Sequence, residues 1–395
     1  MKEVLNIDQL GEYLSGIKDK ETEITSFLKD LVKTPSLSGE EGKIADLVSD
    51  KLAELGYGVA VDEMGNIIAH RGGGSGKTIL FDGHLDHIQP GAPGGWSHDP
   101  YGAEVVDGIL YGRATVDMKG ALAAMIYGCA EPETDGTLFL TLVVHEETNE
   151  GVATKKIIED KGLIIDACVL GEPTDLQLSV GQRGRCVFRV TTKGATSHAS
   201  MPELGVNALY LMTPIVNRIR DGNMELPTHD FLGRGTMAVT ALRCFPGAGP
   251  IVPDHCEIEV DRRLVPQETL AGVLDEMRSL APGAQVELLR DELKCYTGYT
   301  TSADQYFPGW IIDEDHWIVQ DSREAIKEGM KRVPGIISWR FSTDGIATAG
   351  QLGIPTVGFG PGDPALAHQP NEHISLDAVT AAARGYCALA HRLAT

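Results

Sequence analysis

The stretch Thr78-Ile-Leu-Phe-Asp-Gly-His-Leu-Asp-His87 gives the first indication of the fold. Residues 78–82 form a short apolar run, which is typical of a buried strand. His84 and Asp86 follow it, two residues apart, so on an extended chain they project to one side. A carboxylate beside a histidine can orient a metal-ligating imidazole, although a solvated loop histidine next to an acid is an equally good interpretation. The stretch therefore predicts a strand that delivers polar side chains at its carboxyl end.

Similar apolar runs recur along the chain, at 137–145, 166–170 and 355–359. Helical periodicity separates them, around 118–130, 151–161 and 376–392, and two further amphipathic helices precede the first strand, around 24–32 and 44–55. Buried strands that alternate with helices favour an α/β fold with a largely parallel sheet flanked by helices.

The middle of the chain has a different pattern. Its expected elements follow the order β-α-β-β-α-β, at 185–192, 205–221, 236–245, 255–263, 267–280 and 284–290. This order is typical of a ferredoxin-like unit. Gly181–Gly184 and the polar stretch 291–302 are the expected hinges. We therefore predict a catalytic domain from 1–182 and 295–395, interrupted by residues 183–294, which we call the insert.

Composition excludes several classes of protein. The 395 residues carry 34 Lys+Arg against 56 Asp+Glu, a formal net charge of −22, which disfavours binding to nucleic acid. No apolar run approaches the roughly 20 residues that span a bilayer, and the first residues are too polar for a signal peptide. The 7 cysteines include no CxxC pair, which indicates a reducing compartment. These features predict a cytoplasmic enzyme without a membrane partner.

Other acids and histidines also follow the expected strands. Asp117 precedes a helix, His145-Glu146-Glu147 ends the run 137–145, Glu172 follows 166–170, and His368 lies beyond 355–359. Ligands bind beyond the carboxyl ends of strands in open α/β sheets. Each residue has a structural alternative: Asp117 could be a helix N-cap, and the glutamates could be a solvated strand end.

Among these residues, however, a set of two histidines and three carboxylates would be suited to Zn²⁺ and tolerant of Mn²⁺ or Co²⁺. Five ligands exceed the three that one catalytic zinc needs, so they could serve two metals if one carboxylate bridges them. A spare acid beside the cluster would then act as the general base.

The motifs in order resemble the dinuclear zinc aminoacylase/carboxypeptidase family, which includes acetylornithine deacetylase and succinyl-diaminopimelate desuccinylase. The motifs are Gly83–Asp86, Gly112–Gly120, Glu146–Glu147, Gly171–Thr174 and Ala367–His368, and together they cover almost the whole chain. Four further stretches are similar to the bacterial selenium-metabolism-linked hydrolase branch, namely 181–185, 261–264, 306–310 and 341–345.

The resemblance implies a role for each site residue. Asp117 would bridge two metals, with His84 and Glu172 completing one and Glu147 and His368 the other. Glu146 would be the general base, and Asp86 would orient His84. The peptide bond that follows the bridging aspartate, here Asp117–Met118, is often cis in the family.

The resemblance extends to the insert. Segment 194–202 is similar to a dimerisation-lid segment, in which the histidine, here His198, reaches the active site of the neighbouring subunit. Arg263 matches an arginine that can bind a substrate carboxylate, although a surface salt bridge would also explain it. Gly360, in the turn after 355–359, is a third candidate for substrate binding. Pro250 stands where the family usually has asparagine, so the substrate could differ.

These features predict a homodimeric, metal-dependent hydrolase that removes a small acyl group from an amino-acid-like substrate. The alternatives are a dipeptidase or carboxypeptidase, an N-carbamoyl amino acid hydrolase, and a metal-binding protein without catalysis. The presence of Glu146 argues against the last.

Overall fold

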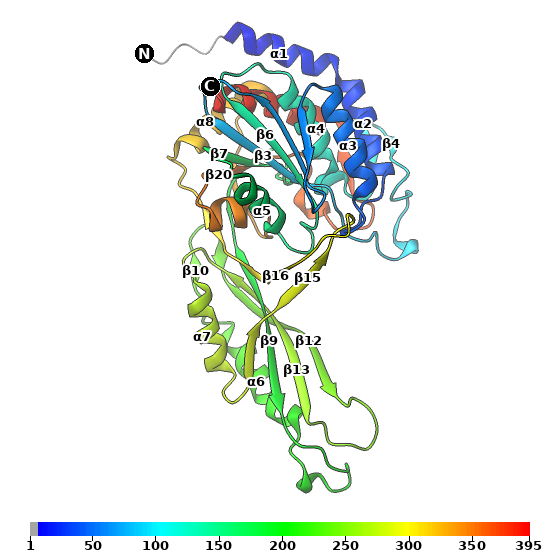
Figure 1. Cartoon of the computed structure of the whole chain (residues 1–395), viewed down its shortest axis with the longest axis vertical. Helices are drawn as coiled ribbons and strands as arrows, with labels where there is room; N and C mark the ends of the chain where they lie inside the picture. The colour runs from blue at the N-terminus through cyan, green and yellow to red at the C-terminus, as the bar shows by residue number, and fades with distance from the viewer. Residues whose placement is uncertain (1–6) are drawn as a thin grey trace.

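Two β-sheets lie at opposite ends of the molecule's long axis in the computed structural model, which describes residues 7–395 (Figure 1). The larger sheet has nine strands in the order β1-β2-β6-β3-β7-β20-β8-β18, with β19 pairing β8. They are β1 (Gly58–Val61), β2 (Ile67–Gly72), β3 (Thr78–His84), β6 (Thr137–Val143), β7 (Ala167–Leu170), β8 (Leu178–Gln182), β18 (Trp310–Ile311), β19 (Ile336–Trp339) and β20 (Thr356–Gly358). The adjacent strands β6, β3, β7 and β20 run parallel, as predicted for this α/β fold.

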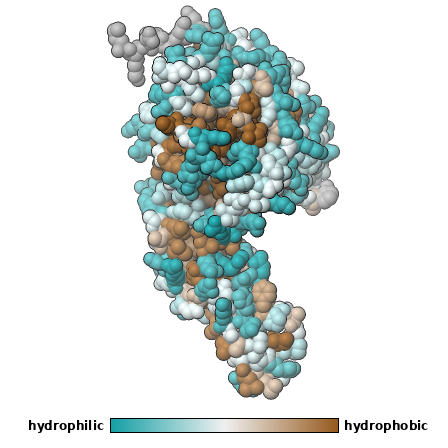
Figure 2. All heavy atoms as spheres, viewed as in Figure 1, coloured by the Kyte–Doolittle hydropathy of each residue, from teal (hydrophilic) through white to brown (hydrophobic). Residues whose placement is uncertain are grey.

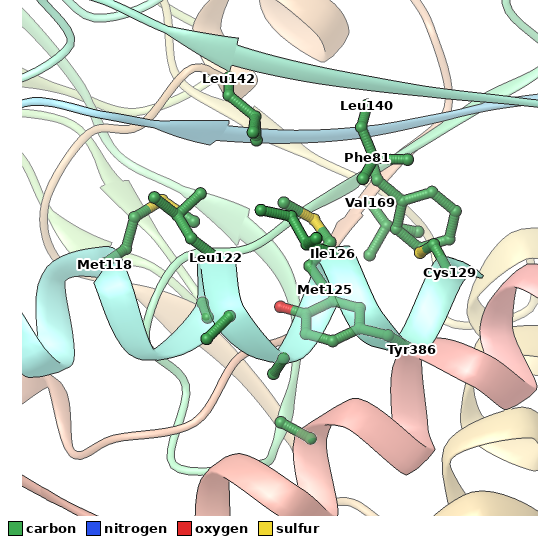
Figure 3. Close-up of a cluster of buried hydrophobic side chains, with 14 of the residues drawn as sticks. Phe81, Met118, Leu122, Met125, Ile126, Cys129, Leu140, Leu142, Val169 and Tyr386 are labelled. Atoms are coloured by element: carbon green, nitrogen blue, oxygen red, sulfur yellow. The ribbon is translucent and has the colours of Figure 1, made fainter. Parts of the chain in front are cut away.

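Helices cover this sheet. They are α1 (Ile7–Asp19), α2 (Glu21–Lys33), α3 (Gly42–Glu54), α4 (Gly120–Ala130), α5 (Val152–Lys161), α8 (Trp317–Met330) and α9 (Leu376–Leu393). Helix α4 is apolar around its whole circumference because it lies between the sheet and α9. Figure 3 shows Leu122 and Ile126 on the side of α4 that faces Leu142 and Leu140 of the sheet, with Tyr386 of α9 near the same helix. This packing fixes the loop before α4, which carries Asp117.

The insert forms the second sheet. Its elements are β9 (Gly184–Lys193), α6 (Ala208–Gly222), β12 (Thr236–Phe245), β13 (His255–Leu264), α7 (Leu270–Leu280) and β14 (Gln285–Leu288). This is the predicted element order, and the strands pair antiparallel in the order β12-β13-β9-β14, with β17 (Tyr306–Phe307) also on β9. Phe188, Ile215 and Ile258 belong to a hydrophobic core separate from that of the larger sheet. The exact domain boundaries stay a prediction.

The second expected hinge has a different structure from the one predicted. Strands β15 (Arg290–Lys294) and β16 (Thr300–Asp304) form an antiparallel hairpin within the polar stretch. Charged residues hide the strand pattern there, since Leu293 is the one fully buried position in β15. The predicted boundary at residue 295 therefore falls inside a hairpin.

Short elements complete the fold. The strands are β4 (Glu104–Val106), β5 (Ile109–Tyr111), β10 (Thr228–His229), β11 (Gly233–Arg234) and β21 (His373–Ser375), and the helical turns are η1 (Pro93–Gly95), η2 (Thr115–Lys119), η3 (Pro202–Leu204), η4 (Ile346–Gln351) and η5 (Pro364–Leu366). Among the described residues, no helix is both long enough and apolar enough to cross a membrane.

Candidate metal centre

The predicted ligands converge at one edge of the larger sheet. Strand β3 ends at His84, β6 ends three residues before Glu146, and β7 ends two residues before Glu172. Because these strands are parallel neighbours, their carboxyl ends meet at the same edge. The sheet therefore brings together residues that lie far apart in the sequence.

Asp117 lies at the centre of the cluster. Its Oδ1 is 3.0 Å from Nε2 of His84, and its Oδ2 is 3.3 Å from Nε2 of His368. The two oxygens of one carboxylate thus face two different histidines. This is the arrangement that a carboxylate bridging two cations requires.

The other carboxylates divide between the two histidines. An oxygen of Glu147 is 3.0 Å from Nε2 of His368. Oxygens of Glu172 and Glu146 are 3.6 and 3.9 Å from Nε2 of His84. Two sets have ligand atoms within 4.8 Å of one another: His84 with Asp117 and Glu147, and His84 with Glu146 and Glu172.

The electrostatics of the cluster fit a bound cation. Burial, with Glu172 nearby, raises the pKa of Glu146 well above its ordinary value. Burial and the charge of Asp117 raise the pKa of Glu172 in the same way and that of Glu147 to about 7. Crowded carboxylates must take up protons unless a cation lies between them. The donor set of carboxylates and imidazoles therefore suits divalent metals.

Asp86 orients the cluster through different atoms from those predicted. Its carboxylate is 3.7 Å from Nδ1 of His84, whereas its backbone carbonyl lies 3.0 Å from that nitrogen. The carboxylate instead accepts hydrogen bonds from the backbone N–H groups of Glu146 and Glu147, at 3.1 and 3.2 Å. Asp86 thus fixes the backbones of Glu146 and Glu147 as well as the ring of His84.

Glu372, for which the sequence predicts no role, holds the loop that carries Asp117. Its fully buried carboxylate accepts a hydrogen bond from Arg113 at 2.7 Å and from three backbone N–H groups, those of Ala114, Val116 and Asp117, at 2.8–3.2 Å. The Asp117–Met118 peptide bond in this loop is cis, as predicted. The only signal in the sequence was the position of Glu372 four residues after His368.

A cavity of about 420 Å³ opens beside the ligands. Arg185 and Arg263, which are directly opposite each other on β9 and β13, line its wall. Arg263 donates a hydrogen bond to Asp261 at 2.8 Å, and Arg185 pairs with Glu150 at 2.9 Å. Arg263 therefore forms a salt bridge, as the alternative interpretation of this residue expected, and it also lies in the cavity wall.

The other two candidates for substrate binding lie elsewhere. The N–H of Gly360 donates to the hydroxyl of Thr174, and its carbonyl accepts from the N–H of Leu176, so its backbone is engaged beside Glu172. His198 is exposed and contacts Ser200 at 2.7 Å. Within the described chain, neither residue lines the cavity.

Comparison with known proteins agrees with the site. The profile described as Peptidase family M20/M25/M40 matches residues 80–392. The uncharacterized protein YgeY of Escherichia coli K12 is 34% identical over 369 residues, which cover 91% of each chain. Succinyl-diaminopimelate desuccinylase 2 of Ruegeria sp. TM1040 is 28% identical and covers 89% of this chain and 90% of its own. The M20 family metallo-carboxypeptidase Sso-CP2 of Sulfolobus solfataricus has a TM-score of 0.75 at 18% identity, covering 94% of this chain and 99% of its own.

The α/β fold with this cluster of acids and histidines defines a metal-dependent hydrolase of amide bonds. More specifically, the chain belongs to peptidase family M20/M25/M40, as the resemblance predicted.

A Glu372→Gln variant should bind metal about 10- to 100-fold more weakly, the usual cost of losing an outer partner of a ligand. The new amide keeps the size of the side chain but places N–H groups against the backbone donors around Asp117. Competition with a chromogenic chelator measures the affinity. Glu104→Gln is the matched control, because Glu104 is exposed and pairs with His98 at 2.9 Å. Unchanged affinity in Glu372→Gln would contradict the positioning role.

Proposed function

We propose that this hydrolase cleaves the amide bond of a small N-acyl amino acid or a related compound and uses two divalent metal ions. His84, Asp117 and Glu172 would hold one ion, and Asp117, Glu147 and His368 the other. The observation that carries this proposal is the orientation of Asp117, whose two oxygens face different histidines. Zn²⁺ suits these ligands best, and Co²⁺ or Mn²⁺ could replace it.

When bound, the two ions would polarise the scissile carbonyl and lower the pKa of the attacking water. Glu146 would take the proton of that water and pass it to the leaving nitrogen. Asp86 supports this role by fixing the Glu146 backbone. Arg263 in the cavity wall would bind a carboxylate of the substrate, since a guanidinium matches the planar geometry of that group.

A screen by liquid chromatography tests the substrate class. N-acyl amino acids, N-carbamoyl amino acids and dipeptides would each be incubated with protein supplied with Zn²⁺, Mn²⁺ or Co²⁺. If the protein is a deacylase, we expect its highest turnover with an N-acyl amino acid. Preferential cleavage of dipeptides or of N-carbamoyl compounds would instead establish one of the two alternatives predicted from the sequence.

The reconstituted protein should contain close to two divalent ions per chain and should lose activity to chelators, because the two oxygens of Asp117 face different histidines. Elemental analysis of the gel-filtered protein measures the content, and activity after dialysis against a chelator measures the dependence. A content of one ion or fewer after full reconstitution would exclude a dinuclear centre.

We further propose a cytoplasmic homodimer assembled through the insert. Large apolar side chains are exposed on the insert, including Met201, Leu204, Val206, Tyr210, Leu242 and Phe245. Figure 2 shows apolar atoms at the surface of this end of the molecule. Such surfaces mark interfaces between proteins. Seven free cysteines support a reducing compartment.

A further inference from the structure

Two cysteines of the insert lie opposite each other on neighbouring strands. Cys244 of β12 pairs in register with Cys256 of β13, and their Sγ atoms are 3.0 Å apart. Both are free thiols. Cys186, the third cysteine of this sheet, instead has Arg262 and Tyr306 as its cross-strand partners.

The geometry of this pair suits a disulfide bond. Directly opposed residues of an antiparallel pair have Cα atoms about 4.5–5.5 Å apart, within the range of about 4.4–6.8 Å that a disulfide spans. The sulfurs must approach by only about 1 Å to reach the bond length of about 2.05 Å. Since the two residues already lie opposite each other, the bond requires no change in strand register.

We propose that Cys244 and Cys256 are a modification site that forms a reversible cross-strand disulfide with low-molecular-weight disulfides. This proposal is independent of the function proposed for the metal centre. Among the seven cysteines, Cys244 is the one that is only partly buried, whereas Cys256 is fully buried. An oxidant from solvent therefore meets Cys244 first.

The reaction proceeds by two exchanges. The sulfur of Cys244 attacks one sulfur of the small disulfide RSSR, which forms a mixed disulfide on Cys244 and releases RSH. The sulfur of Cys256 then attacks Cys244 Sγ, which forms the protein disulfide and releases the second RSH. The two protein thiols lose two electrons and two protons in total, and RSSR gains both.

The bond would close the loop that supports the segment carrying His198. Cys244 and Cys256 stand at the two ends of loop 246–254. This loop accepts a hydrogen bond at Pro250 from the N–H of Ala199 and donates one from Val252 to the carbonyl of Ser197, at 2.7 and 2.9 Å. Phe245 and His255 pair at the base of the loop, next to the two cysteines. A covalent bond between Cys244 and Cys256 would oppose local opening of the strands there and so would restrain the attached segment.

Incubation of the full-length protein with oxidised glutathione tests the proposal. Intact mass should fall by about 2 Da, since two hydrogens leave. Peptide mapping should join the peptides that contain Cys244 and Cys256, and a thiol reductant should restore the original mass. Cys186→Ala should form the same bond, whereas Cys244→Ala and Cys256→Ala should not. A stable glutathione adduct on Cys244 in the unsubstituted protein would overturn the proposal, as would a crosslink between other cysteines.

Hydrogen exchange tests the effect on the loop. The N–H groups of Val252 and Ala199 should exchange about tenfold or more slowly in the oxidised protein than in the reduced protein. Cys244→Ala treated with the same oxidant should show no change. Equal exchange in the oxidised and reduced protein would show that the bond forms without restraining the segment, which would overturn that step.

Discussion

Glu146→Gln should retain its metal ions and lose activity by at least about 100-fold, the low end for removing a general base. Glutamine keeps the size and the backbone hydrogen bond to Asp86 but accepts no proton. Glu146 could act as a metal ligand instead of a base, because one of its oxygens lies 3.9 Å from Nε2 of His84 and belongs to a possible ligand group. Turnover measured at saturating metal, together with elemental analysis, separates a base from a ligand.

Glu147→Gln is the matched comparison. Glu147 directly follows Glu146 in the chain, and its backbone N–H donates to the same carboxylate, that of Asp86. Unlike that of Glu146, the side chain of Glu147 contacts His368, at 3.0 Å. The Glu147→Gln variant should therefore lose metal affinity as well as activity. If Glu146→Gln and Glu147→Gln lose metal equally, the proposed division of roles is wrong.

The positions of His84, Glu146 and Glu172 were predictable because they follow parallel strands, β3, β6 and β7, whose carboxyl ends meet at one edge of the sheet. Asp117 follows none of these strands and lies instead in the loop before α4. The order of β-α-β-β-α-β in the insert was likewise readable from the spacing of apolar residues. These features need only local periodicity and the geometry of a parallel sheet.

Features that depend on contacts between distant segments were not predictable. The buried pair of Arg113 and Glu372 joins residues 259 positions apart, and no local pattern indicates it. The pairing of Cys244 with Cys256 depends on a register that shifts between Val239 and Ala241, where β12 has an irregularity. One residue of slip would place the two thiols on opposite faces of the sheet.

The position of His198 has a consequence for the assembly. Strand β9 leaves the cavity at Arg185 and ends at Lys193, so at about 3.3 Å per residue its far end lies roughly 26 Å from Arg185. His198 follows that end and pairs with Ile251 of the loop there. An imidazole cannot span that distance. The segment that carries it also exposes the apolar side chains of Met201 and Leu204. If His198 takes part in catalysis, it must therefore do so in a neighbouring subunit.

We predict that the imidazole of His198 donates a hydrogen bond to the oxyanion that forms in the site of the neighbouring subunit. His198→Ala should then be folded and fully metallated but should turn over about 10²- to 10³-fold more slowly, the usual cost of losing one such donor. Mixing the His198→Ala and Glu146→Gln proteins, each nearly inactive alone, tests whether the neighbouring subunit supplies His198. In a hybrid dimer, the site that retains Glu146 receives His198 from the other subunit, while the second site lacks both residues. Each hybrid should regain about half the activity of an intact dimer, because one of its two sites is complete. Mass spectrometry would verify that the subunits have exchanged. If activity then does not recover, His198 does not act across the interface.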